Sequence, residues 1–163
     1  MRRLIATAAA VGAALAMTAG VALAAITFHS GPTVTFSGGS ATATFNVSGL
    51  GNLPARATLD MAGSATWGCR NHGKNVAPGH PETLATGSTT QELKPSEKNG
   101  RSTVTVTATL TPPATPTPQD IGCPNPAGNW TVYLVSESVT SATLTIEQPF
   151  GNVIYGPVTF NAP

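Results

Sequence analysis

The chain has 163 residues, of which only 9% are charged, and its formal net charge is +1. Soluble globular domains are usually about one quarter charged, and the eight basic residues here are too few for the basic surface that nucleic-acid binding requires. The low net charge and the hydrophobic content of 40% permit collapse into a core, which argues against disorder driven by charge. We therefore expect a folded domain that does not bind nucleic acid.

The first 24 residues have the organisation of a secretory signal peptide. Arg2 and Arg3 precede the uncharged residues 4–24, which end in Ala22-Leu23-Ala24 and so provide the small residues that signal peptidase requires. The alternative is an uncleaved anchor, since about 20 apolar residues can span a bilayer. The weak hydrophobicity of alanine and glycine favours cleavage. We expect residues 25–163 to be secreted as one extracellular domain that no longer contacts the membrane.

Beyond residue 24, apolar and polar residues alternate with a period of two along most of the chain. Val104, Val106 and Ala108, for example, alternate with threonines. Such alternation is typical of antiparallel strands that bury one face and expose the other. The strongest predicted strands are 41–47, 57–69, 104–110, 130–134 and 142–146, and weaker ones are 26–36, 84–93 and 153–160. The Asn99-Gly100 pair predicts a tight turn before the strand at 102–110.

About seven to nine short strands, and no segment with helical periodicity, predict an all-β domain. We expect an antiparallel, immunoglobulin-like β-sandwich of two sheets packed face to face; a small barrel is the alternative. Threonine predominates on the exposed side of the strands, where it combines β-branching with a polar group. Trp67 and Trp130 lie at inward positions, so we expect them in the core and not on a sugar-stacking platform, whereas Tyr133 and Tyr155 are expected to face outward.

Cys69 and Cys123 are the only cysteines in the chain. In an exported protein, an even number of cysteines indicates a disulfide. Closing a loop of about 55 residues stabilises a fold by roughly 4 kcal/mol in the chain-entropy model. That is a large share of a typical net stability of about 5–15 kcal/mol.

Two segments lack strand alternation, namely residues 70–83 and the proline-rich residues 111–129. Long loops without internal structure are uncommon unless they have a function. Because Cys69 precedes the first segment and Cys123 lies within the second, a disulfide would hold both at one end of the sandwich. We therefore predict a binding surface there. Its candidate residues are Arg70, His72, Lys74, His80, Glu82 and Asp120.

Metal-binding and catalytic chemistry have little support in these segments. The two cysteines together with His72 and His80 could surround zinc or copper, but an oxidising compartment favours a disulfide with two exposed histidines. No Gly-x-Ser-x-Gly sequence is present and the few carboxylates are isolated, so neither a nucleophile nor a carboxylate pair is evident. We expect no catalytic residues, no metal and no cofactor.

The stretch from Cys69 to Pro81, CRNHGKNVAPGHP, resembles a segment of small secreted immunoglobulin-like proteins of high-GC Gram-positive, actinobacterial type. Residues 96–101 (SEKNGR) and 122–126 (GCPNP), followed by an Asn-Trp-Thr strand, are similar to later landmarks of the same group. The likeness covers roughly residues 45–147, and Ala127-Gly128 is an insertion relative to it. It implies a single disulfide and a β-sandwich, and it implies no activity.

The sequence therefore predicts a secreted, non-enzymatic β-sandwich that binds through residues 70–83 and 111–129. The partner would be an extracellular protein, a glycan or a small molecule. One alternative is a small-molecule carrier, because the Ala/Thr/Gly-rich composition is loosely similar to that of the enediyne-carrying apoproteins, which have two disulfides where this chain can form one. A metal-dependent or hydrolytic enzyme is the other alternative.

Overall fold

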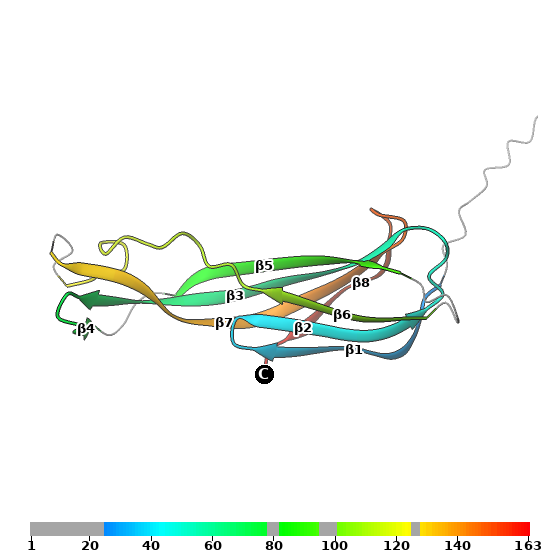
Figure 1. Cartoon of the computed structure of the whole chain (residues 1–163), viewed down its shortest axis with the longest axis horizontal. Helices are drawn as coiled ribbons and strands as arrows, with labels where there is room; N and C mark the ends of the chain where they lie inside the picture. Colours follow the sequence, from blue (N-terminus) through cyan, green and yellow to red (C-terminus); the bar gives the residue numbers. More distant parts are fainter. Residues whose placement is uncertain (1–24, 78–81, 95–100, 125–127) are drawn as a thin grey trace, which may run out of the picture.

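The computed structural model describes residues 25–77, 82–94, 101–124 and 128–163. In this part the chain folds into two antiparallel sheets that pack face to face (Figure 1). The smaller sheet has the order β1-β2-β6, with strands β1 (Thr27–Ser37), β2 (Ser40–Ser48) and β6 (Arg101–Thr109). The larger sheet has the order β4-β3-β7-β8, and β5 pairs with β3 on the same side as β4. Its strands are β3 (Ala55–Asn71), β4 (Val76–Ala77), β5 (Glu82–Leu93), β7 (Trp130–Glu147) and β8 (Val153–Asn161).

The predicted all-β sandwich is confirmed, and the eight strands of the described residues lie within the expected seven to nine. The weaker predicted strands at 26–36, 84–93 and 153–160 are present as β1, β5 and β8, whereas the two-residue β4 was not predicted. The expected signal peptide at 1–24 and the Asn99-Gly100 turn lie outside the described residues. Within the part of the chain that is described, no helix has the length and apolar character needed to cross a membrane.

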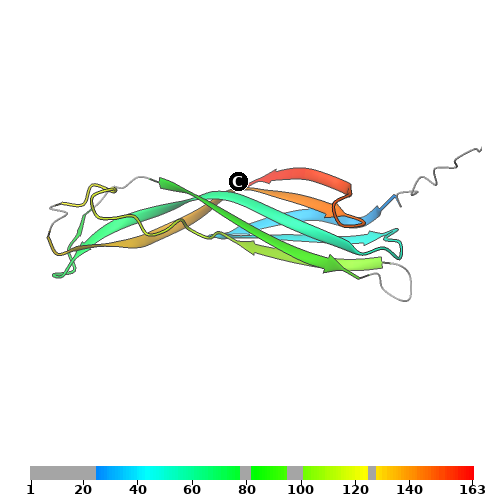
Figure 2. The ribbon, with the colours of Figure 1, turned by 90° about the horizontal axis from the view of Figure 1, so that it is seen from above.

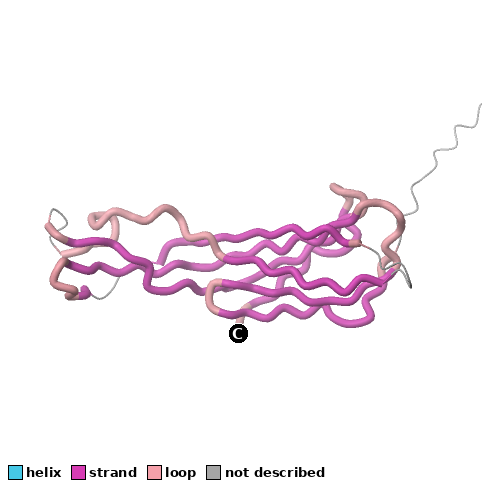
Figure 3. The backbone as a smooth tube through the Cα atoms, viewed as in Figure 1, coloured by secondary structure: helices cyan, strands magenta, loops and turns pink. Residues whose placement is uncertain are grey.

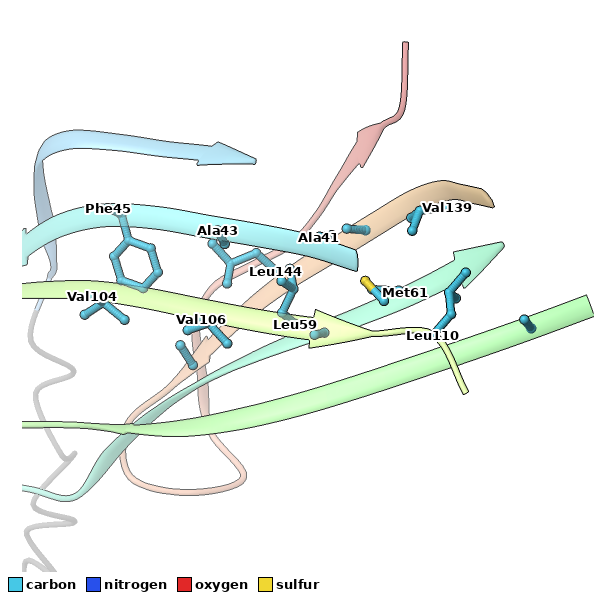
Figure 4. Close-up of a cluster of buried hydrophobic side chains, with 14 of the residues drawn as sticks. Ala41, Ala43, Phe45, Leu59, Met61, Val104, Val106, Leu110, Val139 and Leu144 are labelled. Atoms are coloured by element: carbon cyan, nitrogen blue, oxygen red, sulfur yellow. The ribbon is translucent and has the colours of Figure 1, made fainter. Parts of the chain in front are cut away.

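The core forms where inward side chains of β2 and β6 meet those of β3 and β7 (Figure 4). Phe45 from the smaller sheet and Leu59 and Leu144 from the larger one are at most 1% exposed. The expectation that Tyr155 faces outward is wrong, because its ring packs edge-on against Phe28 beside this core. On the outer faces, threonines pair across neighbouring strands, as in the hydroxyls of Thr42 and Thr107, which lie 3.0 Å apart. Because successive side chains point to opposite faces of a strand, the alternation in the sequence gives each sheet one apolar face and one face that carries hydroxyls.

β7 is one long strand that the sequence presents as two. It carries an extra residue at Val135 and another at Thr140, where its pairing with β3 shifts register. Each bulge moves the inward positions by one residue, because side chains alternate strictly along a strand. Inward residues are even-numbered up to 134, odd-numbered at 137 and 139, and even-numbered again from 142. The predicted strands 130–134 and 142–146 are thus two parts of β7, and the interruption between them comes from the bulges.

The outer edge of β7 lacks a partner strand over residues 130–139 in the described structure, because β8 pairs only with residues 141–147. Besides its bulges, this edge has an inward-facing Glu137, whose Oε1 is buried without a hydrogen-bond partner among the described residues. A Cβ at position 39 would lie 2.8 Å from Oε2 of Glu137. The glycine at this position therefore leaves room for the carboxylate. Bulges and inward charges discourage an exposed edge from pairing with another chain.

β3 and β7 extend beyond the smaller sheet at one end of the molecule (Figures 1 and 2). We call this extension the arm: residues 64–71 of β3, residues 130–138 of β7, and β4. The irregular segment after β6 runs along the arm (Figure 3). We call the opposite end of the sandwich, where the β2–β3 loop and the β7–β8 turn lie, the base.

We predict that Phe45→Ala lowers the free energy of unfolding by about 3–5 kcal/mol, because it leaves a cavity between the sheets. Phe150→Ala is the matched control, since Phe150 is 46% exposed, and it should cost less than about 1 kcal/mol. Urea denaturation followed by tryptophan fluorescence measures both changes. Equal losses for the two variants would contradict this description of the core.

Candidate binding surface on the arm

A disulfide joins the arm to the segment that runs along it. Cys69, near the end of β3, is bonded to Cys123, and their Cα atoms are 5.7 Å apart. The predicted disulfide is confirmed. Because both sulfurs are used in this bond, neither cysteine is available as a metal ligand. Moreover, no three His, Cys, Asp or Glu residues of the described chain lie close enough together to hold a metal ion.

The inner face of the arm is covered by the segment that carries Cys123. A tight turn, in which the Cys123 amide donates to the Pro118 carbonyl at 2.9 Å, positions the buried Ile121 and Cys123. Trp67 of β3 is 4% exposed, and its indole Nε1 donates to the Thr83 hydroxyl at 2.9 Å. The expectation that Trp67 belongs to the core is confirmed, and the half-buried Trp130 packs against the same core. The arm thus has a small core of its own under this segment.

Asp120 stabilises the turn that places Ile121 and Cys123. Its carboxylate accepts hydrogen bonds from the hydroxyl of Thr117 at 2.6 Å and from the amide of Thr117 at 2.8 Å. The hydroxyl bond, with the amide bond second, lowers the pKa of Asp120 below its ordinary value, because both donors favour the charged form. The structure therefore gives Asp120 a local role in the turn.

The outer face of the arm has a stack of two side chains at its centre. The guanidinium carbon of Arg70 lies 4.5 Å from the centre of the Tyr133 ring. This ring and Val135 lie over Gly68 of β3, where a Cβ would be 2.8 Å from Cζ of Tyr133 and 2.9 Å from Cγ2 of Val135. The absence of a side chain at Gly68 therefore allows the Tyr133 ring to lie across β3. Since Cβ direction alternates along β3, this face is the one opposite Trp67 and Cys69.

Three exposed apolar side chains lie on the same face as this stack. Leu84 of β5 is opposite Ser64, and it is 87% exposed. Val76 of β4 is opposite Arg70, and Val76 and Val135 are each 54% exposed. The pairing places all of these side chains on the same face. We call this set, Arg70, Val76, Leu84, Tyr133 and Val135, the arm patch.

The turn between β3 and β4 forms the tip of the arm. Lys74 adopts a φ of 63°, in the left-handed region that costs most residues about 1 kcal/mol. The turn is closed by the Asn71 side chain, which accepts a hydrogen bond from the Asn75 amide at 2.9 Å. The Nδ1 atom of His72 lies 3.1 Å from the Asn129 carbonyl oxygen. This contact connects the tip to the start of β7. The tip therefore has a defined shape, with exposed His72 and Lys74.

The structure separates the candidate residues that the sequence grouped together. Arg70 and Glu82 lie on the outer face, because Glu82 is opposite Thr66, and His72 and Lys74 lie at the adjacent tip. Asp120 belongs to the segment over the inner face, and its carboxylate is bonded to Thr117. His80 lies outside the described residues.

Sequence reasoning missed most of the arm patch. Val76 was placed in a loop, and Leu84 was assigned to a weak strand without a face. Val135 follows Tyr133 on the outside, but the predicted strand ended at residue 134, because the bulge interrupts the alternation after that point. Tyr133 alone was placed on the outside. The one available signal was Gly68 beside Trp67, because a glycine within a strand often marks a close approach by another group.

The chain matches no family model, no curated protein and no solved structure. The resemblance noted in the sequence therefore has no support from these comparisons, and function must be argued from the arm itself.

We predict that Thr117→Val raises the pKa of Asp120 toward its ordinary value, because the hydroxyl donor is lost while the amide donor remains. A lowered carboxyl pKa contributes stability above the pKa of the unfolded chain, and this is lost as pH falls through the folded-state pKa. The variant should therefore lose the contribution of Asp120 at a higher pH than the wild type. Carboxyl ¹³C shifts measured against pH report the pKa. Thr115→Val, in the same exposed segment, is the control, and an unchanged pKa in Thr117→Val would contradict the assignment.

Proposed function

We propose that the chain is a secreted, non-enzymatic binding module that docks an extracellular protein on the arm patch. The observation that carries the proposal is the group of exposed apolar side chains around the Arg70–Tyr133 stack. Large apolar side chains that are exposed together on one face are typical of surfaces that bind a partner. The outer faces of the sandwich are rich in threonine, so this apolar surface is distinctive within the molecule.

The chemistry of the arm patch favours a protein partner. It is an open sheet surface and not a cavity, and tyrosine and arginine are enriched where proteins bind one another. Arg70 forms no ion pair with the described residues. Lys74 adds a second positive charge close by, against the single carboxylate of Glu82. We infer a partner with an apolar surface and an acidic residue that meets Arg70.

Secretion and an immunoglobulin-like fold are parts of this proposal. The N-terminal sequence has the organisation of a signal peptide, and disulfides persist mainly in oxidising compartments. The sheet orders β1-β2-β6 and β5-β3-β7-β8 correspond to the A-B-E and C′-C-F-G strands of an immunoglobulin-like sandwich. The disulfide differs from the usual one between strands B and F, because here it joins strand C to a loop. These features support a scaffold that presents binding surfaces and has no catalytic centre.

The alternative of a small-molecule carrier has less support. A carrier needs a cleft, yet Phe45, Leu59 and Leu144 fill the space between the sheets. An enzyme would need a nucleophile or a cluster of ionisable groups, and the candidate charges are divided between two faces of the arm. We therefore develop the binding proposal alone.

The test compares Leu84→Asp and Arg70→Glu with two matched controls, Val153→Asp and Arg101→Glu. Leu84 and Val153 are exposed apolar residues on different parts of the molecule, and Arg101 is an exposed arginine at the start of β6. A partner recovered from the extracellular fraction of the host is purified and titrated by calorimetry. We expect each arm variant to weaken binding at least about tenfold, and the controls to bind like the wild type.

Two results would overturn the proposal. One is a purified partner that binds the arm variants as tightly as the wild type. The other is failure to recover any protein that binds the wild-type chain saturably. Proton NMR spectra of each variant establish that the fold is intact before binding is compared.

A further inference from the structure

We propose that the base of the sandwich has a second binding site, specific for a neutral oligosaccharide. The base is hollowed by about 540 Å³ between the β2–β3 loop, the end of β5 and the β7–β8 turn. This volume lies within the range typical of ligand sites, about 300–1,000 Å³. We call it the base hollow. Its side chains relevant here are Asn52, Leu53, Glu92, Lys94 and Phe150.

The loops around the base hollow are fixed by a buried amide. Gln148 is only 4% exposed, and its Nε2 donates to the Leu53 carbonyl at 2.8 Å. In the β7–β8 turn, the Asn152 side chain donates to the Gln148 carbonyl at 2.9 Å. A buried polar side chain needs such partners, so the two loops hold each other in place. The amide fixes the position of Leu53, which is nevertheless 48% exposed.

Phe150 is fixed by charged neighbours. Glu147 accepts hydrogen bonds from Nε of Arg56 at 2.7 Å and from the Gly151 amide at 2.9 Å. The guanidinium carbon of Arg56 lies 5.0 Å from the centre of the Phe150 ring, yet Phe150 remains 46% exposed. The amide of Gly151, with Arg56 second, lowers the pKa of Glu147, because both donors favour the charged carboxylate. Phe150 is thus held in solvent by its contact with Arg56, next to Leu53, whose backbone carbonyl is bonded to Gln148. Pre-organised contacts of this kind favour binding.

The composition of the base hollow indicates the class of ligand. Leu53 and Phe150 offer apolar contact, while Asn52, Glu92 and Lys94 offer hydrogen-bond donors and acceptors. Glu92 and Lys94 balance each other in charge, which gives no preference for an ionic ligand. A pyranose ring is neutral and has an apolar C–H face with hydroxyls around its rim, so it can contact both kinds of side chain together. Because the hollow is open and not enclosed, it suits a sugar chain lying across the base.

This inference is independent of the arm patch, because the base lies at the opposite end of the sandwich (Figure 1). It also differs from the sugar platform considered for Trp67 and Trp130. Trp67 is buried and Trp130 half-buried, whereas Phe150 is exposed. The aromatic residue that is available to a sugar was not evident from the alternation of the sequence, because it lies in a turn.

The test is titration of the ¹⁵N-labelled domain with four soluble hexasaccharides: cellohexaose, chitohexaose, xylohexaose and maltohexaose. We expect at least one to bind, with amide shifts confined to residues 50–56, 92–94 and 147–153. Phe150→Ala should weaken that binding about tenfold or more, and Glu92→Gln should also weaken it. Leu134→Ala, an exposed apolar substitution on the arm outside the arm patch, is the control and should have no effect.

Indole serves as a comparison probe, because it has an aromatic ring and no hydroxyl groups. Binding of indole without binding of any hexasaccharide would overturn the proposal in favour of an apolar ligand. Absence of binding by all probes would overturn it outright. Shifts located on the arm, or unchanged affinity in Phe150→Ala, would also contradict it. The ¹⁵N spectrum of each variant shows whether the domain is folded, so that loss of binding can be assigned to the site.

Discussion

The disulfide between Cys69 and Cys123 is the constraint on which the arm depends. Away from the smaller sheet, β3 and β7 form little more than a two-stranded ribbon, and such ribbons are marginally stable alone. The disulfide fixes the irregular segment across the inner face, where Trp67, Cys69 and Ile121 are buried. Closing a loop of this length contributes about 4 kcal/mol in the chain-entropy model. With one face covered in this way, the other can remain open and still hold a defined shape.

The large exposed apolar residues lie at the two ends of the molecule. Val76, Leu84, Leu134 and Val135 belong to the arm and to the adjoining part of β5, and Leu53, Phe150 and Val153 belong to the base. Between them the outer faces carry threonine, and the open edge of β7 is protected by bulges and by Glu137. Exposed apolar side chains are therefore concentrated at the two ends, where we propose the arm patch and the base hollow as binding sites.

Alternation along the chain was sufficient to predict the sandwich, because each sheet has one buried and one solvated face. The core positions of Phe45, Leu59 and Trp67 follow directly from it. It could not predict that β7 is continuous, since a bulge inserts a residue without any compositional mark. It also could not predict which face of the arm each candidate occupies, because Asp120 lies in a segment without periodicity. The base hollow escaped prediction because loops far apart in sequence form it through Gln148.

Native-state hydrogen exchange of the oxidised and reduced protein shows whether the disulfide supports the arm. In the oxidised protein, the amides of residues 64–71 and 130–138 that donate between β3 and β7 should be protected. After reduction, these amides and those around residues 118–123 should exchange much faster, while amides of β2 and β6 stay protected. Identical exchange in the two forms, or loss of protection throughout the sandwich at once, would contradict the claim that the disulfide specifically supports the arm.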